Sequence, residues 1–330
     1  MDIADLLAFC VKRGASDLHL SAGVAPMLRI DGEIQHSALP VLAPDQAREL
    51  IHSVMSDSQR SAFSVEHEAD FAYADEKSGR FRVNAFEHQR GAAAVFRSIA
   101  RSVPDLDSLG LVDIFAPLCS LQSGLVLVTG ATGSGKTTTL AAMVDHLNRT
   151  RRYHILTLED PIEFIHESRQ SLINQREVHR DTHSFSIALR SALREDPDVI
   201  MLGEMRDLDS IRLALTAAET GHLVLATLHT PSAAKTIDRV IDVFPAEEKA
   251  TVRAQLAESL QAVVCQALVK KQDGGRVAAH EIMLGTPAIR NLIRENKVAQ
   301  MVSAIQTGAA LGMQTLEMSL KRLQEKGLIA

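Results

Sequence analysis

The stretch Val126-Leu127-Val128-Thr129-Gly130-Ala131-Thr132-Gly133-Ser134-Gly135-Lys136-Thr137-Thr138-Thr139-Leu140 joins an apolar run, a glycine-rich segment and a helix start. Residues 130–137 match G-x-x-x-x-G-K-[ST] at every position. The glycines of such a loop let backbone N–H groups turn toward phosphate oxygens, and the following helix points the positive end of its dipole at the anion. Lys136 brings a point charge to the β- and γ-phosphates, and the Thr137 hydroxyl can ligate Mg²⁺. The stretch therefore predicts a nucleoside triphosphate site.

The composition limits the classes of protein that fit. The chain has 330 residues, of which 46% are hydrophobic and 23% charged, enough for two domains with cores of their own. The formal net charge is −6 without any block of five like charges, which does not favour a dedicated nucleic-acid binder. The longest apolar runs, such as 124–129 and 223–228, are much shorter than the ~18–20 residues that span a bilayer. The first residues lack the basic region of a signal peptide, so we expect a cytoplasmic protein without a transmembrane segment.

The pattern of hydrophobicity changes near residue 100. Before it, alternating runs such as 79–86 are interrupted by turn signals such as Asp31-Gly32, which favours a small α+β domain with a mostly antiparallel sheet. Residues 101–120 contain prolines and glycine and predict a linker with a short helix. We therefore predict a domain over residues 1–100, a linker over 101–120 and a second domain over 121–330.

The second domain has the pattern of an α/β fold. Four apolar runs, at 125–128, 155–158, 199–202 and 223–226, alternate with helical stretches. Continuous apolar strands separated by helices are typical of a parallel sheet that is covered on both faces. Later in the chain, residues 246–271 have the spacing of one long helix.

Acidic residues follow the second of these runs. Glu159-Asp160-Pro161-Ile162-Glu163 places three carboxylates at the carboxyl end of a strand, where α/β sheets bind ligands. Carboxylates at this position can ligate Mg²⁺ or polarise a water molecule. The alternative is a solvated turn with a helix N-cap, but the phosphate loop elsewhere in the chain favours a functional role.

The segment Asp198–Asp207 resembles a Walker B strand with one departure. Gly203 stands where the Mg²⁺-binding aspartate is usual, and Glu204 follows it. Glu204 is placed to orient or deprotonate the attacking water, and the metal would then be held mainly by Thr137, nucleotide oxygens, water and Glu163. The alternative for Glu204 is a charge at the start of the next helix.

Two histidines bracket the strand 223–228. His222 precedes it and His229 follows it, and a lone histidine beside an apolar strand is commonly a structural residue. Thr227 and His229 lie at the carboxyl end of the strand, where they could sense the γ-phosphate. In the first domain, Arg80 and Arg82 share one face of a strand by alternation.

The arginines of the first domain allow two interpretations. They can be solvated strand residues, or one of them, with Arg97 on the paired strand, can act as an arginine finger on a neighbour's γ-phosphate. Such a finger stabilises the charge that develops in the transition state.

Taken together, these segments resemble the secretion-superfamily ATPases, the motors of type II secretion and type IV pili. The matching segments are, in order, the Walker A loop, Asp box, Walker B strand and His box, at residues 130–137, 159–164, 193–207 and 221–230. The segments 14–20 and Ala288–Glu295 are similar to the signatures of the pilus retraction ATPases in that superfamily. The resemblance implies a PAS-like α+β domain followed by a RecA-like P-loop ATPase domain, assembled as a ring of six copies.

The resemblance also implies a role for each matching residue. The residues expected to bind ATP are Gly130, Thr132, Gly133, Ser134, Gly135, Lys136, Thr137, Thr138 and His222. Thr137 and Glu163 are expected to hold Mg²⁺. The catalytic group is expected to comprise Glu204, Glu163, His229 and the inter-subunit arginines Arg82 and Arg97.

The function implied is ATP hydrolysis that powers pilus retraction and twitching motility. The implied partners are an inner-membrane platform protein of the pilus and a paralogous retraction ATPase, with no nucleic acid, at the cytoplasmic face of the inner membrane. Two alternatives stay open: an accessory retraction ATPase, and a RecA-like nucleic-acid translocase. The translocase would need basic or aromatic loops at a pore, whereas the chain has no Trp and two Tyr.

Overall fold

The structure is a computed structural model that describes residues 2–30, 32–99 and 102–330. The chain divides into two compact units, Met1–Ser102 and Val103–Ala330. Each unit has a hydrophobic core of its own. The phosphate loop belongs to the second unit, and the candidate arginines belong to the first.

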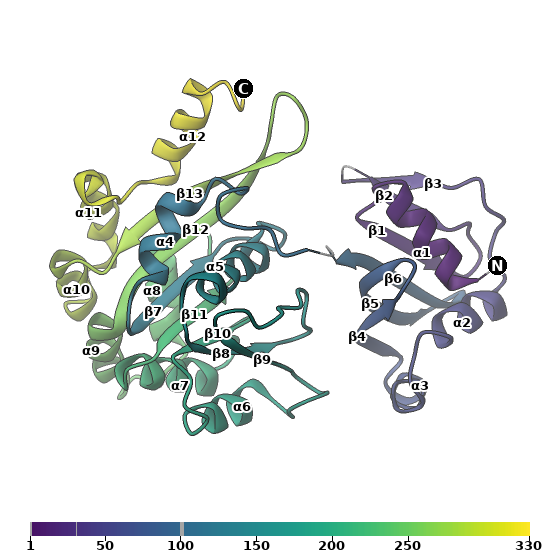
Figure 1. Cartoon of the computed structure of the whole chain (residues 1–330), viewed down its shortest axis with the longest axis horizontal. Coiled ribbons are helices and arrows are strands. Elements are labelled where there is room, and N and C mark those ends of the chain that lie inside the picture. The colour runs from purple at the N-terminus through teal and green to yellow at the C-terminus, as the bar shows by residue number, and fades with distance from the viewer. Residues whose placement is uncertain (1, 31, 100–101) are drawn as a thin grey trace. The chain divides into compact units, whose positions relative to one another are not determined.

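The first unit pairs three helices with an antiparallel sheet (Figure 1). The sheet order is β3-β2-β1-β6-β5-β4, and every neighbouring pair is antiparallel, as predicted. Asp31 of the predicted turn lies outside the described residues. The elements are α1 (Ile3–Lys12), β1 (Asp17–Ser21), β2 (Met27–Ile30), β3 (Glu33–His36), α2 (Pro44–His52), α3 (Asp57–Glu66), β4 (Glu68–Asp75), β5 (Gly79–His88) and β6 (Gly91–Ile99).

The alternation of side chains along strand β5 determines which face of the sheet carries Arg82. Phe81, Val83 and Ala85 are buried in the core, and the residues between them point to the opposite face because side chains alternate along a strand. Arg82 therefore lies on the face of the sheet away from the core, directly opposite Arg97 of β6 in the register.

Residues 103–120, predicted as a linker, form part of the second unit. Leu106, Leu111 and Phe115 are buried and pack in a core cluster with residues of the central sheet. The helix α4 (Val112–Cys119) lies in this segment. Prolines and glycine suggested a linker, but the apolar residues between them cover one face of the sheet, and burial of that apolar surface attaches the segment to the unit.

The second unit is built on a seven-stranded sheet with the order β13-β12-β7-β11-β10-β8-β9. All neighbouring strands are parallel except the antiparallel pair β12 and β13. The strands are β7 (Gly124–Thr129), β8 (His154–Glu159), β9 (Leu172–Glu177), β10 (Val199–Leu202), β11 (Leu223–Leu228), β12 (Leu260–Lys270) and β13 (Arg276–Leu284). The helices are α5 (Lys136–Thr150), α6 (Phe185–Ala192), α7 (Leu208–Glu219), α8 (Ala233–Asp242), α9 (Lys249–Ser259), α10 (Pro287–Arg294), α11 (Met301–Thr307) and α12 (Leu316–Glu325).

Helices cover both faces of this sheet, which explains its continuous apolar strands. On β7, Leu125 and Leu127 pack in the core cluster that includes α6 to α11, whereas Val126 and Val128 pack in the cluster with α4 and α5. Because the strands are parallel, the carboxyl ends of β7, β8, β10 and β11 meet at one edge of the sheet. This edge collects the predicted site residues that follow those strands.

The prediction of one long helix over residues 246–271 is wrong in its second half. Helix α9 ends at Ser259, and Leu260 to Lys270 form β12, which pairs with both β7 and β13. A strand that is buried on both faces carries no two-residue alternation, so its sequence cannot be distinguished from a buried helix by periodicity. The two strand partners decide the conformation.

The segment Ala288–Glu295, which resembles the signature of the pilus retraction ATPases, forms most of α10. Its two arginines bind residues at the end of α9. Arg290 donates from Nε to the Gly285 carbonyl at 2.7 Å and from Nη1 to the carbonyls of Ala257, at 2.7 Å, and of Glu258. Arg294 forms an ion pair with the Glu258 side chain. Arg290 thus satisfies carbonyls at the end of α9, which have no partner within their own helix.

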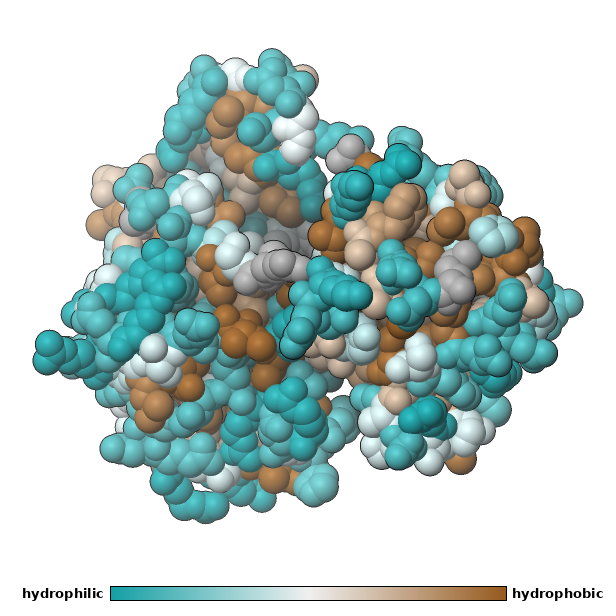
Figure 2. Space-filling model, turned by 45° about the vertical axis from the view of Figure 1, so that its right-hand side comes forward, coloured by the Kyte–Doolittle hydropathy of each residue, from teal (hydrophilic) through white to brown (hydrophobic). Residues whose placement is uncertain are grey.

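Figure 2 shows hydrophilic side chains over much of the face drawn, with apolar side chains gathered in smaller areas between them. Large apolar side chains that are exposed, such as Val65, Ile165 and Leu311, are dispersed along the chain. Within the described residues, none of the helices combines the length and the apolar character needed to cross a bilayer.

Candidate nucleotide-binding and catalytic site

The phosphate loop follows β7 and leads into α5, as the sequence predicted. Gly130 and Gly135 have φ values of 136° and 89°, a region that favours glycine. Space also requires glycine, because a Cβ atom at Gly130 would lie 2.2 Å from the Gln266 carbonyl oxygen. At Gly135 it would lie 2.8 Å from Nε2 of the same glutamine. The loop is therefore shaped against β12 as well as by its own glycines.

Lys136 closes the loop. Its Nζ donates to the carbonyl oxygens of Gly130 and Ala131, both at 3.0 Å, and the residue is buried. Burial lowers the pKa of the Lys136 ammonium, and the negative charges of Glu204 and Glu163 act in the opposite direction. The positive charge of Lys136 thus lies near two carboxylates that the sequence motifs predicted for this site, Glu204 and Glu163.

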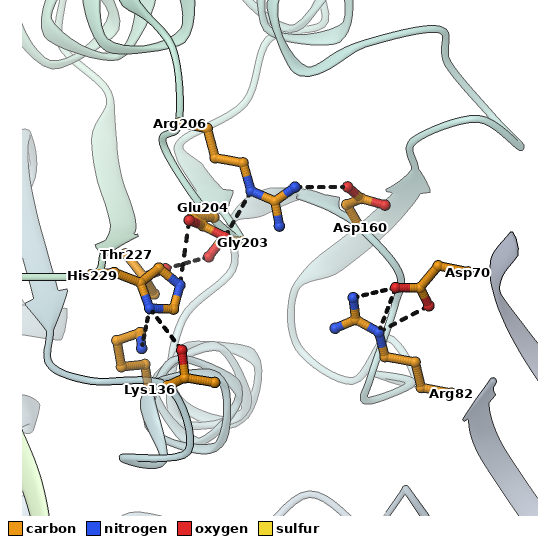
Figure 3. A network of polar contacts seen from close by, with 10 residues as sticks. Asp70, Arg82, Lys136, Asp160, Gly203, Glu204, Arg206, Thr227 and His229 are labelled. Atoms are coloured by element: carbon orange, nitrogen blue, oxygen red, sulfur yellow. Dashed lines mark hydrogen bonds and ion pairs between the residues drawn. The ribbon is translucent and has the colours of Figure 1, made fainter. Parts of the chain in front are cut away.

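His229 connects the loop to the Walker B segment (Figure 3). Its Nδ1 lies 3.4 Å from Lys136 Nζ and 3.5 Å from Thr132 Oγ1, and its Nε2 lies 3.3 Å from Glu204 Oε1. A lysine ammonium can only donate, so Nδ1 accepts and the ring hydrogen on Nε2 points to the carboxylate. His229 therefore bridges Lys136, the candidate phosphate-binding lysine, and Glu204, the candidate catalytic glutamate.

Glu204 is held from its other side by Arg206. The Arg206 Nε donates to Glu204 Oε2 at 2.8 Å, and its Nη1 lies 3.5 Å from Asp160 Oδ2. Thr227 fixes the preceding residue, because its hydroxyl donates to the Gly203 carbonyl at 2.5 Å. Figure 3 shows these residues around the end of the sheet. Thr227 was expected to sense the γ-phosphate, but it is 2% exposed and its hydroxyl is used to hold the Walker B turn.

The acidic segment at the end of β8 contributes one deeply buried carboxylate, Glu159, and two half-buried ones, Asp160 and Glu163. Glu159 is 4% exposed, and its Oε1 accepts from Thr157 Oγ1 at 2.6 Å and from Gln175 Nε2 at 3.0 Å. Burial raises the pKa of Glu159 to about 7. Glu163 is half-buried, and its charge partly opposes the lowering of the Lys136 pKa by burial. Glu163 and Glu204 therefore both lie close enough to Lys136, in the phosphate loop, for their charges to act on it.

Thr137 and Thr138 lie in the first turn of α5, and both are half-buried. Gly133 and Ser134 lie in the loop between them and β7. The oxygen donors of Thr137 and Glu163 are of the kind that Mg²⁺ prefers, so the residues predicted to hold the metal fit it chemically.

His222 lies at the opposite edge of the sheet from the phosphate loop of the same chain, and its expected role in binding the nucleotide stays a prediction. Residue Leu223, which follows it, is paired with Gly124 at the start of β7, whereas Leu228 is paired with Thr129 at the end. The six residues of β11 place His222 roughly 20 Å from the phosphate edge. Its Nδ1 contacts the Ala217 carbonyl at 3.0 Å. His222 and His229 thus belong to one motif but lie at opposite ends of β11.

The two candidate arginines lie in the first unit, each beside an aspartate. Arg82 donates to Asp70 from Nε, at 3.1 and 3.2 Å, and from Nη2 at 2.7 Å (Figure 3). Arg97 Nε donates to Asp17, a buried residue of β1, at 2.8 Å, and 60% of the Arg97 side chain is exposed. Like charges directly opposite each other repel, and the two aspartates offset this repulsion. The sheet therefore presents two arginines side by side.

Arg206 and Gln266 contact the site but do not follow from the sequence motifs. Arg206 lies two residues after Glu204, and its spacing was a detectable signal for an ion pair. Gln266 comes from β12, more than a hundred residues after the loop that it touches, inside a segment predicted as helix. Nothing local in the sequence connects Gln266 to the loop.

Comparison with known proteins identifies the family of the chain. The family model described as "Type II/IV secretion system protein" matches residues 2–275. The type IV pilus retraction ATPase PilT of Pseudomonas aeruginosa is 65% identical over 330 residues, which cover 100% of this chain and 96% of that protein. The type IV pilus ATPase PilU of the same organism is 41% identical over 330 residues, covering 100% of this chain and 86% of PilU.

A crystal structure of the pilus retraction motor PilT with bound ADP has a similar fold. It matches with a TM-score of 0.90 and 46% identity, and the match covers 100% of this chain and 95% of the other. This likeness confirms the predicted fold class, a RecA-like P-loop ATPase domain preceded by a smaller α+β domain. The chain belongs to the type II/IV secretion system protein family and is one of its pilus retraction ATPases.

Proposed function

We propose that this ATPase works as a ring of six copies at the cytoplasmic face of the inner membrane, where Mg²⁺-dependent ATP hydrolysis drives retraction of a type IV pilus. The observation that carries the site assignment is the chain of contacts from Lys136 through His229 to Glu204, at 3.4 and 3.3 Å. It joins a phosphate-binding cation to a carboxylate that can act on water. The printed descriptions of PilT support the pilus as the object on which the motor acts.

Hydrolysis of the γ-phosphate requires positioning and charge stabilisation more than covalent chemistry. Lys136 binds the β- and γ-phosphates, and in doing so it exchanges its contacts to the loop carbonyls for phosphate oxygens. Thr137 and Glu163 would hold Mg²⁺, which when bound would supply positive charge against the phosphate oxygens. Glu204, held by Arg206 and His229, orients the attacking water and accepts its proton.

The arginines complete the site from a neighbouring copy. Arg82 and Arg97 supply positive charge to the γ-phosphate of the adjacent subunit in the transition state, where an arginine finger is worth about 10³–10⁵ in turnover. In the single chain, each arginine is paired with an aspartate, Asp70 or Asp17, which keeps it ordered. When the ring closes, each arginine would replace part of its contact with the aspartate by a contact with phosphate oxygens of the neighbouring subunit's nucleotide.

Two experiments test this proposal. The Glu204→Gln variant is expected to bind ATP but to hydrolyse almost none, and wild-type turnover in that variant would overturn the assignment of Glu204. Rings mixed from Lys136→Ala and Arg97→Ala subunits, each inactive alone, are expected to regain up to about a quarter of wild-type turnover, because each can complete the other's site.

Arg60→Ala provides the matched control for loss of an exposed arginine, since Arg60 pairs only with Asp57 of its own helix among the contacts described. Rings that contain it are expected to keep wild-type turnover. Mixed rings without any recovery would contradict the assignment of Arg97 to a neighbouring site. For the pilus itself, the chain is expected to restore retraction in bacteria that lack only their PilT, which an accessory ATPase would not do.

A further inference from the structure

Gln266 lies outside the known motifs and contacts the phosphate loop from another strand. It lies on β12, one residue after Cys265, which is paired with Thr129 at the end of β7. Gln266 is 4% exposed. Its Nε2 donates to the Ser134 carbonyl at 2.6 Å, in the middle of the loop. A buried amide from another strand therefore fixes a loop carbonyl.

The network around Gln266 determines which way its amide points. Oε1 accepts from the Thr139 hydroxyl of α5 at 2.8 Å, and His280 Nε2 lies 3.3 Å from the same oxygen. Because the Ser134 carbonyl can only accept, the nitrogen must face it and the oxygen must face Thr139 and His280. All of these groups are buried, so a reversed amide would leave several of them without partners.

His280 is suited to hold this amide in one orientation. Burial lowers the pKa of His280 to about 4, so its ring is neutral near pH 7 and donates its one hydrogen from Nε2. The backbone N–H of His280 donates to Ser319 Oγ at 3.1 Å, and its carbonyl accepts from Gln314 Nε2 at 3.0 Å. The ring also packs edge-on against Phe115, with centroids 6.1 Å apart. His280 is thus fixed from several sides.

The neighbouring cross-strand pair holds the segment that carries His229. Cys265 and Glu281 are paired in the register next to Gln266 and His280. Cys265 Sγ donates to the Thr230 carbonyl at 3.6 Å, and Glu281 Oε1 accepts from the N–H of Ala233 at 2.6 Å. Two adjacent pairs on β12 and β13 therefore contact the phosphate loop and the residues directly after His229.

We propose that Gln266, oriented by His280 and Thr139, is a positioning residue that holds the phosphate loop in its nucleotide-binding shape. The amide keeps the Ser134 carbonyl turned toward β12, so that the N–H groups of the loop are available to phosphate. The close approach of Gln266 at Gly130 and Gly135 leaves the loop no room to relax toward the strand. This inference rests on the proposed function, because it assumes that the loop binds ATP and ADP.

The variant Gln266→Glu tests the donor alone. Glutamate has the same size, and as a carboxylate it can still accept from Thr139 and His280 but cannot donate to the Ser134 carbonyl, so binding is measured at about pH 8 to favour the ionised form. We expect the Kd for a fluorescent ADP analogue and the KM for ATP to rise about 10- to 100-fold, with a smaller change in kcat at saturating ATP. Thermal unfolding shows whether each variant is folded.

Gln261→Glu is the matched control. Gln261 also lies on β12, and its Nε2 donates to the Ser123 carbonyl at 3.2 Å, just before β7 and at the opposite edge of the sheet. The control is expected to bind the ADP analogue as the wild type does. A Kd for Gln266→Glu equal to that of wild type and Gln261→Glu would overturn the inference, as would a loss of stability without a change in Kd.

A second variant keeps the inference testable if Gln266→Glu does not fold. His280→Phe retains a ring beside Phe115 but removes the Nε2 donor to Gln266, and we expect the Kd to rise about 3- to 10-fold. An unchanged Kd in folded His280→Phe would remove His280 from the mechanism. Failure of the wild-type chain to bind the ADP analogue, in contrast, would contradict the proposed function itself.

Discussion

The Thr227→Val variant tests whether a buried hydroxyl sets the position of Glu204. Thr227 is 2% exposed, and its hydroxyl donates to the Gly203 carbonyl at 2.5 Å. Valine has nearly the same shape, so the packing of β11 is preserved and only the hydrogen bond is lost. A buried carbonyl that loses its donor costs about 1–3 kcal/mol, which corresponds to a lower melting temperature by roughly 2–12 °C for a unit of this size.

The larger effect is expected in turnover. Without the bond, the turn that carries Glu204 can shift, and a displacement of about 1 Å at a catalytic group can cost about 10²-fold in rate. We expect kcat to fall about 10- to 100-fold while the KM for ATP stays near the wild-type value, because Lys136 and the loop are unchanged. Steady-state ATPase assays over a range of ATP concentrations measure both quantities.

Thr216→Val provides the comparison for this substitution. Thr216 is half-buried on α7, and its hydroxyl donates to the Arg212 carbonyl one turn earlier in the same helix, away from the site. We expect wild-type turnover in Thr216→Val. The argument is refuted if Thr227→Val keeps the wild-type kcat, or if it raises KM without lowering kcat.

Three further predictions concern stability. Burial lowers the pKa of His166 from about 6.5 to about 4. Below pH 6.5 the unfolded chain therefore binds more protons than the folded chain, and about 3 kcal/mol of stability is lost as the pH falls through 4. Denaturant titrations of His166→Gln should show a flatter pH dependence of the free energy of unfolding than those of the wild type. Arg290→Ala should lower the free energy of unfolding by about 3 kcal/mol, and Arg290→Lys should restore little of it, since an ammonium cannot reach three carbonyls as a guanidinium fork does; full restoration by lysine would contradict this account. Gly203→Asp should lower stability by about 1–3 kcal/mol in thermal unfolding, because its Cβ would lie 3.3 Å from the Leu158 carbonyl and 3.9 Å from Glu159 Cγ; an unchanged melting temperature would show that the turn has room for the usual Walker B aspartate.

Much of the site could be predicted because its signals are local. The loop at 130–137, Glu163, Glu204 and His229 each follow an apolar strand, and parallel strands bring their carboxyl ends to one edge. His222 shows the limit of this reasoning. It belongs to the same motif as His229, yet it precedes the strand and lies at the opposite edge.

By itself, the sequence determined the nucleotide chemistry, the division into an antiparallel and a parallel part, and the resemblance to pilus retraction ATPases. These properties depend on residue type, spacing and periodicity over short distances along the chain. The tertiary structure alone decided that residues 260–270 are a strand, that Thr227 holds a turn, and that Gln266 supports the loop. Each of these depends on contacts between segments far apart in the chain, where pairing with two strands overrides the local helical pattern and brings a buried amide to a carbonyl.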